Sequence, residues 1–237
     1  MANIPFKITS KTTGESHVIV TDENGYISTE SAWVSHFQDT NKAVDWEDGF
    51  WFGLESVIRD DKGALIYDYY TIDELPCENN KDKKLLTGID LRISIDGYTV
   101  EMGTLTNDPI TLETTAVDKK TGSHGSNPVK DTTIVDTVKY SNVNIGDTYT
   151  IKGRIVHKAN GQTVVVDGRE VTAEKTFKAE KEVGYIDLSF TFDAREVGYE
   201  TVVVFEELYC NGELVASHCD PDDPDQTIVF NPDAEIS

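Results

Sequence analysis

The sequence has few basic residues and no apolar run long enough to cross a bilayer as a helix. Lysine and arginine total 21 against 43 aspartate and glutamate residues, which gives a formal net charge of −22. Nucleic acids and anionic lipid surfaces repel such a chain. We therefore expect no nucleic-acid partner and no membrane insertion.

Targeting signals and a cysteine framework are also missing. The opening residues, MANIPFKITS, lack the basic and apolar regions of a signal peptide. We interpret the sequence as a fragment or mature piece of a longer protein. Three cysteines, Cys77, Cys210 and Cys219, cannot form a disulfide framework. Cys210 and Cys219 could pair with each other, but free cysteines are commonly small buried thiols.

Helical periodicity is scarce, whereas alternation of apolar and polar residues with a period of two is common. The segment YIDLSFTF, residues 185–192, shows this alternation most clearly. Turn signals such as ENG, DDKG, IDG, ANG, VDG and CNG separate the alternating runs. Many short strands joined by such turns are typical of β-sandwiches, so we predict an all-β fold.

The segment TNDP, residues 106–109, is the predicted domain boundary. Its proline cannot donate to a β-ladder, and it follows two turn-forming residues. The boundary divides the chain into residues 1–108 and 109–237, which are both ordinary domain sizes. We expect two tandem β-sandwich domains.

Four polar residues lie in apolar rows of the second domain when strand alternation is applied. They are Thr114, Asp136, Glu206 and Gln226. Burying such groups costs free energy unless they satisfy one another. A single inward threonine or glutamine bonded to the backbone is common, but four together indicate a site.

These residue types support a condensation reaction. Thr114 offers a hydroxyl nucleophile, and the side-chain amide of Gln226 offers a carbonyl with ammonia as the leaving group. His218, eight positions before Gln226, is a candidate general base. Of the Asp136 and Glu206 carboxyls, one should keep its proton and donate it to the amide carbonyl. The predicted product is an ester between Thr114 and Gln226.

The hairpin that carries Glu206 and His218 admits two registers. A two-residue turn at Asn211 and Gly212 would pair Glu206 with Ser217. A loop one residue longer, with a glycine bulge, would pair Glu206 with His218. The proposed site requires roughly the second arrangement.

Residues from about 110 to 230 resemble the VaFE-repeat domain, the intramolecular ester-bond domain of Gram-positive surface adhesins and pilus-like stalks. The matching motifs are TTAVD at Thr114, DTVKY at Asp136, VVFEEL at residues 203–208 and HCDPDDPDQT at His218. The resemblance implies an autocatalytic cross-link between Thr114 and Gln226, assisted by Asp136, Glu206 and His218. It also implies an immunoglobulin-like sandwich.

The first domain resembles the prealbumin-like (CnaB-type) domains that accompany such modules, on the motifs IPFKIT, HVIVTDENGYIST, YYTIDEL and GTLTN. In those relatives a lysine on the first strand forms an isopeptide bond to an asparagine, assisted by an acidic residue. Glu74 and Asn107 match the acid and the acceptor. The lysine-bearing strand would precede Met1, and Lys7 should point outward. We expect no isopeptide bond within this sequence.

Two other features have alternative interpretations. The aromatic-rich segment, residues 33–52, could stack on a glycan or grip a host protein, although aromatic rings also pack in cores. The aspartates of DPDDPD could bind calcium, but the calcium-loop glycine and the distal glutamate are missing. His218 and Cys219 have no second pair at zinc spacing. We expect a solvated loop, no metal and no cofactor.

The sequence therefore predicts a structural stalk fragment of an extracellular, cell-wall-anchored adhesin, cross-linked by its own ester. Its partners would be neighbouring stalk domains of the same chain and an unknown host ligand. Because the reaction turns over once, the protein would not be an enzyme. One alternative is a ligand-binding module that uses residues 33–52. Another is a hydrolase built on Thr114, His218 and Asp136.

Overall fold

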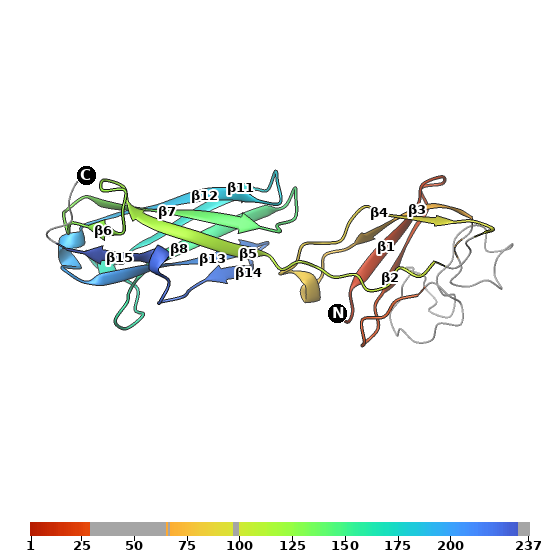
Figure 1. Ribbon diagram of the computed structural model, residues 1–237, viewed down its shortest axis with the longest axis horizontal. Helices are drawn as coiled ribbons and strands as arrows, with labels where there is room; N and C mark the ends of the chain where they lie inside the picture. Colours follow the sequence, from red (N-terminus) through yellow and green to blue (C-terminus); the bar gives the residue numbers. More distant parts are fainter. Residues whose placement is uncertain (29–64, 66, 97–99, 232–237) are drawn as a thin grey trace. The chain divides into compact units, whose positions relative to one another are not determined.

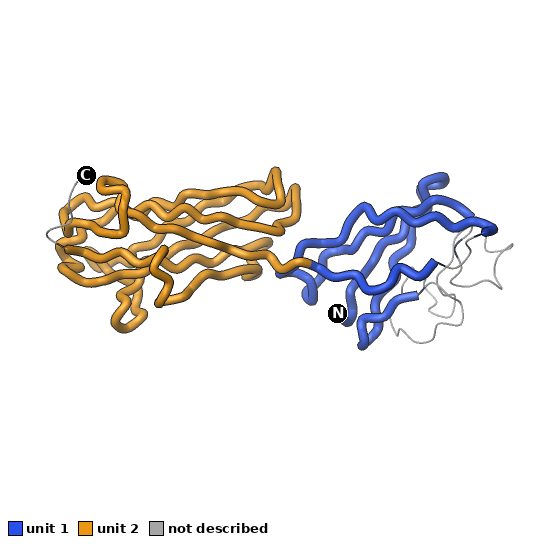
Figure 2. Tube along the Cα trace, viewed as in Figure 1, with its two compact units in different colours: residues 1–107 blue, residues 108–237 orange. Residues whose placement is uncertain are grey.

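The computed structural model describes residues 1–28, 65, 67–96 and 100–231 (Figure 1). The chain divides into two compact units, Met1–Asn107 and Asp108–Ser237, which we call unit 1 and unit 2 (Figure 2). The aromatic-rich segment 33–52 lies outside the described residues. Within the described part of the chain, no helix has the length and apolar character that a membrane span requires.

Unit 1 contains a four-stranded antiparallel sheet in the order β2–β1–β3–β4. Its elements are β1 (Pro5–Ser10), β2 (Ser16–Val20), β3 (Asp68–Glu74), the 3₁₀ turn η3 (Glu78–Asn80) and β4 (Ile89–Ile93). One face buries alternate residues such as Phe6, Ile8 and Tyr70. Lys7 lies on the opposite face, as the alternation predicts. The prealbumin-like character of this unit stays a prediction.

The described part of unit 2, residues 108–231, is built from two principal sheets and a short ribbon. One sheet has the order β12–β7–β5, the other β11–β8–β13–β15–β6, and β14 also pairs with β13. The strands are β5 (Thr111–Asp118), β6 (Gly125–Ser126), β7 (Thr132–Ser141), β8 (Thr148–His157), β9 (Val165–Val166), β10 (Arg169–Glu170), β11 (Thr172–Lys178), β12 (Gly184–Phe192), β13 (Thr201–Cys210), β14 (Glu213–His218) and β15 (Thr227–Phe230). Two 3₁₀ turns, η4 (Ala194–Glu196) and η5 (Pro224–Gln226), complete it. The all-β fold predicted from the sequence is confirmed.

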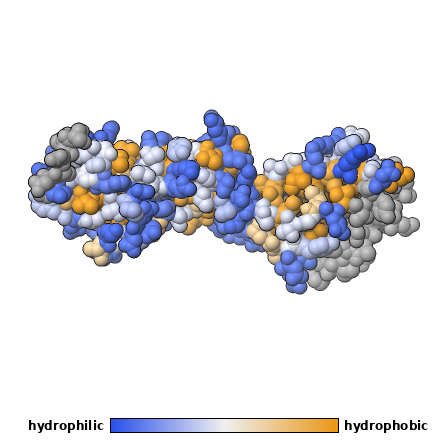
Figure 3. Space-filling view, in the orientation of Figure 1, coloured by the Kyte–Doolittle hydropathy of each residue, from blue (hydrophilic) through white to orange (hydrophobic). Residues whose placement is uncertain are grey.

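The two principal sheets pack their apolar faces together. Ile134 and Phe190 from one sheet join Ile151 and Leu208 from the other in one buried cluster. Gly153 on β8 is needed where the sheets approach, because a Cβ there would lie 2.7 Å from the Phe190 ring. The face of unit 2 that Figure 3 shows is predominantly hydrophilic, with scattered apolar residues. The core of unit 2 is therefore the space between its two sheets.

Candidate cross-linking site

The four polar residues predicted to face inward meet between the two sheets of unit 2. Thr114 on β5 and Asp136 on β7 come from the three-stranded sheet. Glu206 comes from β13, and Gln226 ends η5 directly before β15. Thr114 is 6% exposed and the other three are 0% exposed. Thr115, the neighbour predicted to point outward, is exposed, so the register predicted for β5 is confirmed.

Thr114, Glu206 and Gln226 form a closed triangle of polar contacts. The amide Nε2 of Gln226 donates hydrogen bonds to Thr114 Oγ1 and to Glu206 Oε2. The Thr114 hydroxyl in turn lies 3.4 Å from Glu206 Oε2. Glu206 Oε2 thus contacts both the oxygen that would attack and the nitrogen that would leave.

The direction of the amide differs from the prediction. A protonated carboxyl was expected to donate to the carbonyl oxygen of Gln226, but the amide nitrogen faces Glu206. An NH₂ group has two donors, so it satisfies the two acceptors Thr114 Oγ1 and Glu206 Oε2 together. The carbonyl Oε1 of Gln226 has no hydrogen-bond partner within the described structure.

Burial raises the pKa values of both carboxyls of the site. Burial, followed by the charge of Asp136, raises the pKa of Glu206 to about 10. Burial also raises the pKa of Asp136 to about 6, although nearby Glu206 and His218 act to lower it. Neither Asp136 oxygen has a partner with hydrogen-bond geometry among the described residues, so Asp136 affects Glu206 mainly through its charge. The higher pKa of Glu206 favours a proton on that carboxyl.

His218 ends β14 directly opposite Glu206 on β13. Its Nδ1 lies 3.3 Å from the backbone oxygen of Leu112 on β5, and its Nε2 lies 2.8 Å from Asp223 Oδ2. Both ring nitrogens thus face acceptors, and neither of these contacts is with Thr114. The role of His218 as general base stays a prediction.

A bulge inside β14 produces the pairing of Glu206 with His218. Asn211 and Gly212 have φ values of 52° and 85° and form the two-residue turn between Cys210 and Glu213. The register then shifts between Leu208 and Tyr209, which leaves Val215 as the extra residue of β14. The predicted pairing is confirmed, but the predicted longer loop is wrong, because the extra residue lies in the strand.

Comparison with known proteins identifies this arrangement. A family model described as "T-Q ester bond containing domain" matches residues 110–230. The chain belongs to this family. The matched residues lie within unit 2, which we call the T-Q domain from here on. A search of curated proteins found no match.

Solved structures show only distant similarity. Two crystal forms of a "bacterial adhesin from Mobiluncus mulieris containing intramolecular disulfide, isopeptide, and ester bond cross-links" are 21% and 22% identical, with TM-scores of 0.44 and 0.43. The alignments cover 51% and 52% of this chain and 56% and 57% of the adhesin chain. The major pilin subunit BcpA of Bacillus cereus is 14% identical, with a TM-score of 0.34, over 98% of this chain and 65% of the pilin. These similarities are too low to inform function.

Asp223 is a residue of the T-Q domain that the sequence interpretation missed. It lies in the DPDDPD loop, which we predicted to be solvated, yet it is half-buried and contacts His218. Asp220 and Asp222 in the same loop are exposed. A signal was present, because aspartate is a favoured N-cap and proline a favoured first residue of a helical turn. The solvated-loop prediction is therefore wrong for Asp223.

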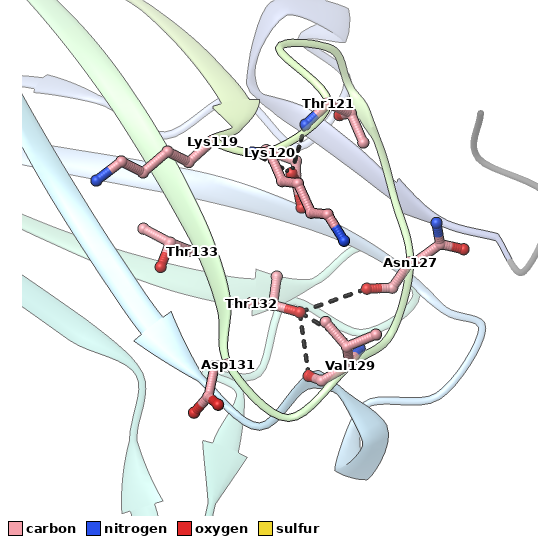
Figure 4. A pocket seen from close by; sticks show the side chains of 9 residues that line it. Lys119, Lys120, Thr121, Asn127, Val129, Asp131, Thr132 and Thr133 are labelled. Carbon is pink, nitrogen blue, oxygen red and sulfur yellow. Dashed lines mark hydrogen bonds between the residues drawn. The ribbon is translucent and has the colours of Figure 1, made fainter. Parts of the chain in front are cut away.

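The T-Q domain also has a cavity of about 220 Å³ away from the four site residues (Figure 4). Its lining is Asp118, Lys119, Lys120, Thr121, Asn127, Val129, Asp131, Thr132 and Thr133. The buried Asp118 carboxylate accepts hydrogen bonds from the backbone of Lys120 and Thr121. The Thr132 hydroxyl bonds the backbone oxygens of Asn127 and Val129. These polar groups hold the loop together, and no predicted site residue lines the cavity.

In unit 1 the structure brings Glu74 and Asn107 together. Glu74 is 2% exposed and accepts a hydrogen bond from Asn107 Nδ2 at 2.5 Å. Asn80, which the sequence interpretation did not select, donates to the other oxygen of Glu74 at 2.9 Å. The acid and acceptor are therefore in contact, and the absence of an isopeptide bond stays a prediction.

The two cysteines of the T-Q domain lie at different places along the β13–β14 hairpin. Cys210 pairs with Glu213 beside the turn, whereas Cys219 follows His218 at the far end of β14. Both are free thiols, and Cys219 Sγ lies 3.7 Å from the backbone oxygen of Glu206. The alternative of a Cys210–Cys219 disulfide is therefore wrong for this fold.

Proposed function

We propose that the T-Q domain closes an ester between Thr114 and Gln226 and thereby serves as a covalently locked structural domain of a cell-surface adhesin. One observation carries the proposal. The Gln226 amide nitrogen donates to Thr114 Oγ1 and to Glu206 Oε2 in a buried space between the two sheets. Reactants held together in a buried site lose most of the entropic barrier to reaction.

The reaction that this geometry supports is an acyl transfer within the chain. Thr114 Oγ1 attacks the side-chain carbonyl carbon of Gln226, the carbon–nitrogen bond breaks, and an ester and one ammonia are formed. Glu206 is placed to move both protons. The carboxyl gives its proton from Oε2 to the departing nitrogen, and the carboxylate oxygen that remains takes the hydroxyl proton of Thr114. Glu206 therefore ends the reaction protonated, as it began.

Asp136 supports this role through its charge. A protonated carboxyl can donate to a leaving amine only if it keeps its proton at working pH, and the pKa of Glu206 is raised by burial and by Asp136. Replacing Asp136 by asparagine should therefore lower the pKa of Glu206, so that less of this carboxyl keeps its proton, and should slow the reaction. The reaction consumes its own side chains, so the domain is a single-turnover system and we do not propose an enzyme.

The position of the bond suggests a mechanical role. Thr114 lies on the first strand of the T-Q domain, and Gln226 lies directly before β15, its last strand. Force applied at the two ends of the domain would load the ester, and the enclosed sheets would be bypassed. A strongly acidic surface suits a protein exposed outside the cell, in a stalk with neighbouring domains of the same chain. We propose a cell-wall-anchored location on the same grounds.

Digestion of the unfolded protein tests the bond directly. Mass spectrometry should find the peptide containing Thr114 joined to the peptide containing Gln226, with one ammonia lost. Glu206→Gln should remove the joined peptide, because glutamine cannot exchange protons in this way. Joined peptides that link Gln226 to a residue other than Thr114 would contradict the proposed pair.

A further inference from the structure

An apolar contact between the two sheets lies directly beside the two carboxyls of the site. Leu188 on β12 pairs with Asp136 on β7, and Gly153 on β8 pairs with Glu206 on β13. A Cβ placed at Gly153 would lie 2.8 Å from Cδ1 of Leu188, so the Leu188 side chain reaches across the core and packs against Gly153. Each carboxyl therefore has one member of this contact as its neighbour within its own sheet.

The apolar contact and the reacting side chains lie on opposite sides of the carboxyl pair. In the three-stranded sheet β7 lies between β12, which carries Leu188, and β5, which carries Thr114. In the other sheet β13 lies between β8, which carries Gly153, and β15, which Gln226 directly precedes. The carboxyl pair thus has its reactants on one side and an apolar contact on the other.

The oxygens of the site would accept hydrogen bonds from water if there were space for it. Both oxygens of Asp136, Oε1 of Glu206 and Oε1 of Gln226 have no partner with hydrogen-bond geometry among the described residues. A buried water needs room and two to four polar partners. The acceptors are present, and the Leu188 side chain, which is 2% exposed, occupies the space beside Asp136.

The charged and titratable groups that face the pair come from several strands. Asp136 and Glu206 face each other from β7 and β13, and His218 ends β14 opposite Glu206. Asp187 on β12 acts to raise the pKa of Asp136, and His218 acts to lower it. For both carboxyls burial is the largest cause of the raised pKa, so the packing around them matters more than any single charge.

We propose that Leu188, packed against Gly153, is a positioning residue of the cross-linking reaction that keeps water away from the Asp136–Glu206 pair. It acts through Glu206, the carboxyl that exchanges protons with the reacting side chains. The proposal rests on the proposed Thr–Gln ester. A carboxyl in a dry place keeps its proton to a higher pH than a hydrated one. Removing Leu188 should therefore make the reaction fail at a lower pH.

Three variants separate the effect of water from the effect of lost packing. Leu188→Ala opens a space beside the unpartnered oxygens, whereas Leu188→Met keeps the apolar volume. Phe192→Leu is the matched control, because it removes as many carbon atoms from the same face of β12. Phe192 is buried against Phe230, and at about 3.3 Å per residue it lies about 13 Å along the strand from Leu188.

The pH dependence of bond formation is the measurement. Cell-free synthesis of the full chain is stopped, the pH is set between 7 and 10.5, and intact mass follows the initial rate at which one ammonia is lost. Circular dichroism checks folding at each pH. Wild type should keep its rate until the pH approaches the pKa of Glu206, about 10. In Leu188→Ala the pH of half-maximal rate should fall by at least about one unit, within the shifts that burial produces. Leu188→Met should match wild type.

A merely structural role would give a different pattern. Phe192→Leu should lower the melting temperature and leave the pH of half-maximal rate unchanged. The proposal is overturned if Leu188→Ala slows the reaction by the same factor at every pH, or if Leu188→Met shifts the profile as far as Leu188→Ala. If Leu188→Ala does not fold, Leu188→Val decides, with a smaller shift in the same direction expected and no shift overturning the proposal. A wild type that keeps its full mass would instead refute the ester itself.

Discussion

Removing the Thr114 hydroxyl should cost the T-Q domain about 5 kcal/mol of stability. Thr114→Val keeps a branched side chain of similar volume in the core and removes the only atom that can form the ester. The cross-link closes a loop of 112 residues. The chain-entropy relation for a cross-link over that length gives about 4.8 kcal/mol at 25 °C.

This loss is large enough to measure by melting. The family match spans residues 110–230, about 120 residues. At about 2.1 cal/mol/K of unfolding entropy per residue, a loss of about 5 kcal/mol lowers the melting temperature by roughly 20 °C. Calorimetry on wild type, Thr114→Val and the exposed control Thr115→Val makes the comparison. A decrease below about 5 °C for Thr114→Val, in a wild type lighter by one ammonia, would refute the reasoning from loop closure.

Three further predictions concern the packing, titration and metal binding of the T-Q domain. Gly153→Ala places a Cβ 2.7 Å from the Phe190 ring, so the free energy of unfolding measured with denaturant should decrease by about 1–3 kcal/mol. An unchanged free energy of unfolding would mean that the two sheets separate easily at this point. In the bond-free Thr114→Val variant, raised carboxyl pKa values mean that folding takes up protons. The stabilisation that comes from this proton uptake is complete at pH values below the ordinary pKa values, 3.8 for Asp136 and 4.5 for Glu206. It is lost as the pH rises through the pKa values in the folded protein, about 6 for Asp136 and about 10 for Glu206. The melting temperature of that variant should therefore decrease as the pH rises from 5 to 9. Adding Glu206→Gln should make the melting temperature depend less on pH. An unchanged dependence would contradict the assignment of the proton to Glu206. The melting temperature should be the same in excess calcium as in the presence of a chelator. A calcium site in the aspartate-rich loop would instead raise the free energy of unfolding by about 2.7 kcal/mol at a hundredfold excess of calcium over Kd.

Alternation along strands was enough to find the four buried residues. Thr114 and Thr115 are chemically identical, but successive side chains of a strand point to opposite faces, and only Thr114 has apolar neighbours two positions away on both sides. Alternation also places Glu206 and Glu207 on opposite faces of their strand, although Glu207 too has apolar neighbours, Phe205 and Tyr209, two positions away. This information is local, so a single sequence contains it.

Features that depend on long-range geometry could not be predicted in the same way. The extra residue of β14 is Val215, an ordinary strand residue that gives no sign of a bulge, and the longer loop that we predicted there is wrong. The direction of the Gln226 amide depends on which acceptors surround it, and these come from β5 and β13. Asp223 could be seen as a cap, but its contact with His218 requires the closed hairpin.

The intact mass of the denatured protein tests the central claim most directly. Ester formation between Thr114 and Gln226 expels one ammonia, so wild type should weigh one ammonia less than its sequence mass. Thr114→Ala should restore the full mass, and Thr115→Ala should keep the loss. Mild alkali or hydroxylamine should open the ester after unfolding, which an amide would resist. A wild type with its full sequence mass, or a loss that persists in Thr114→Ala, would contradict the account.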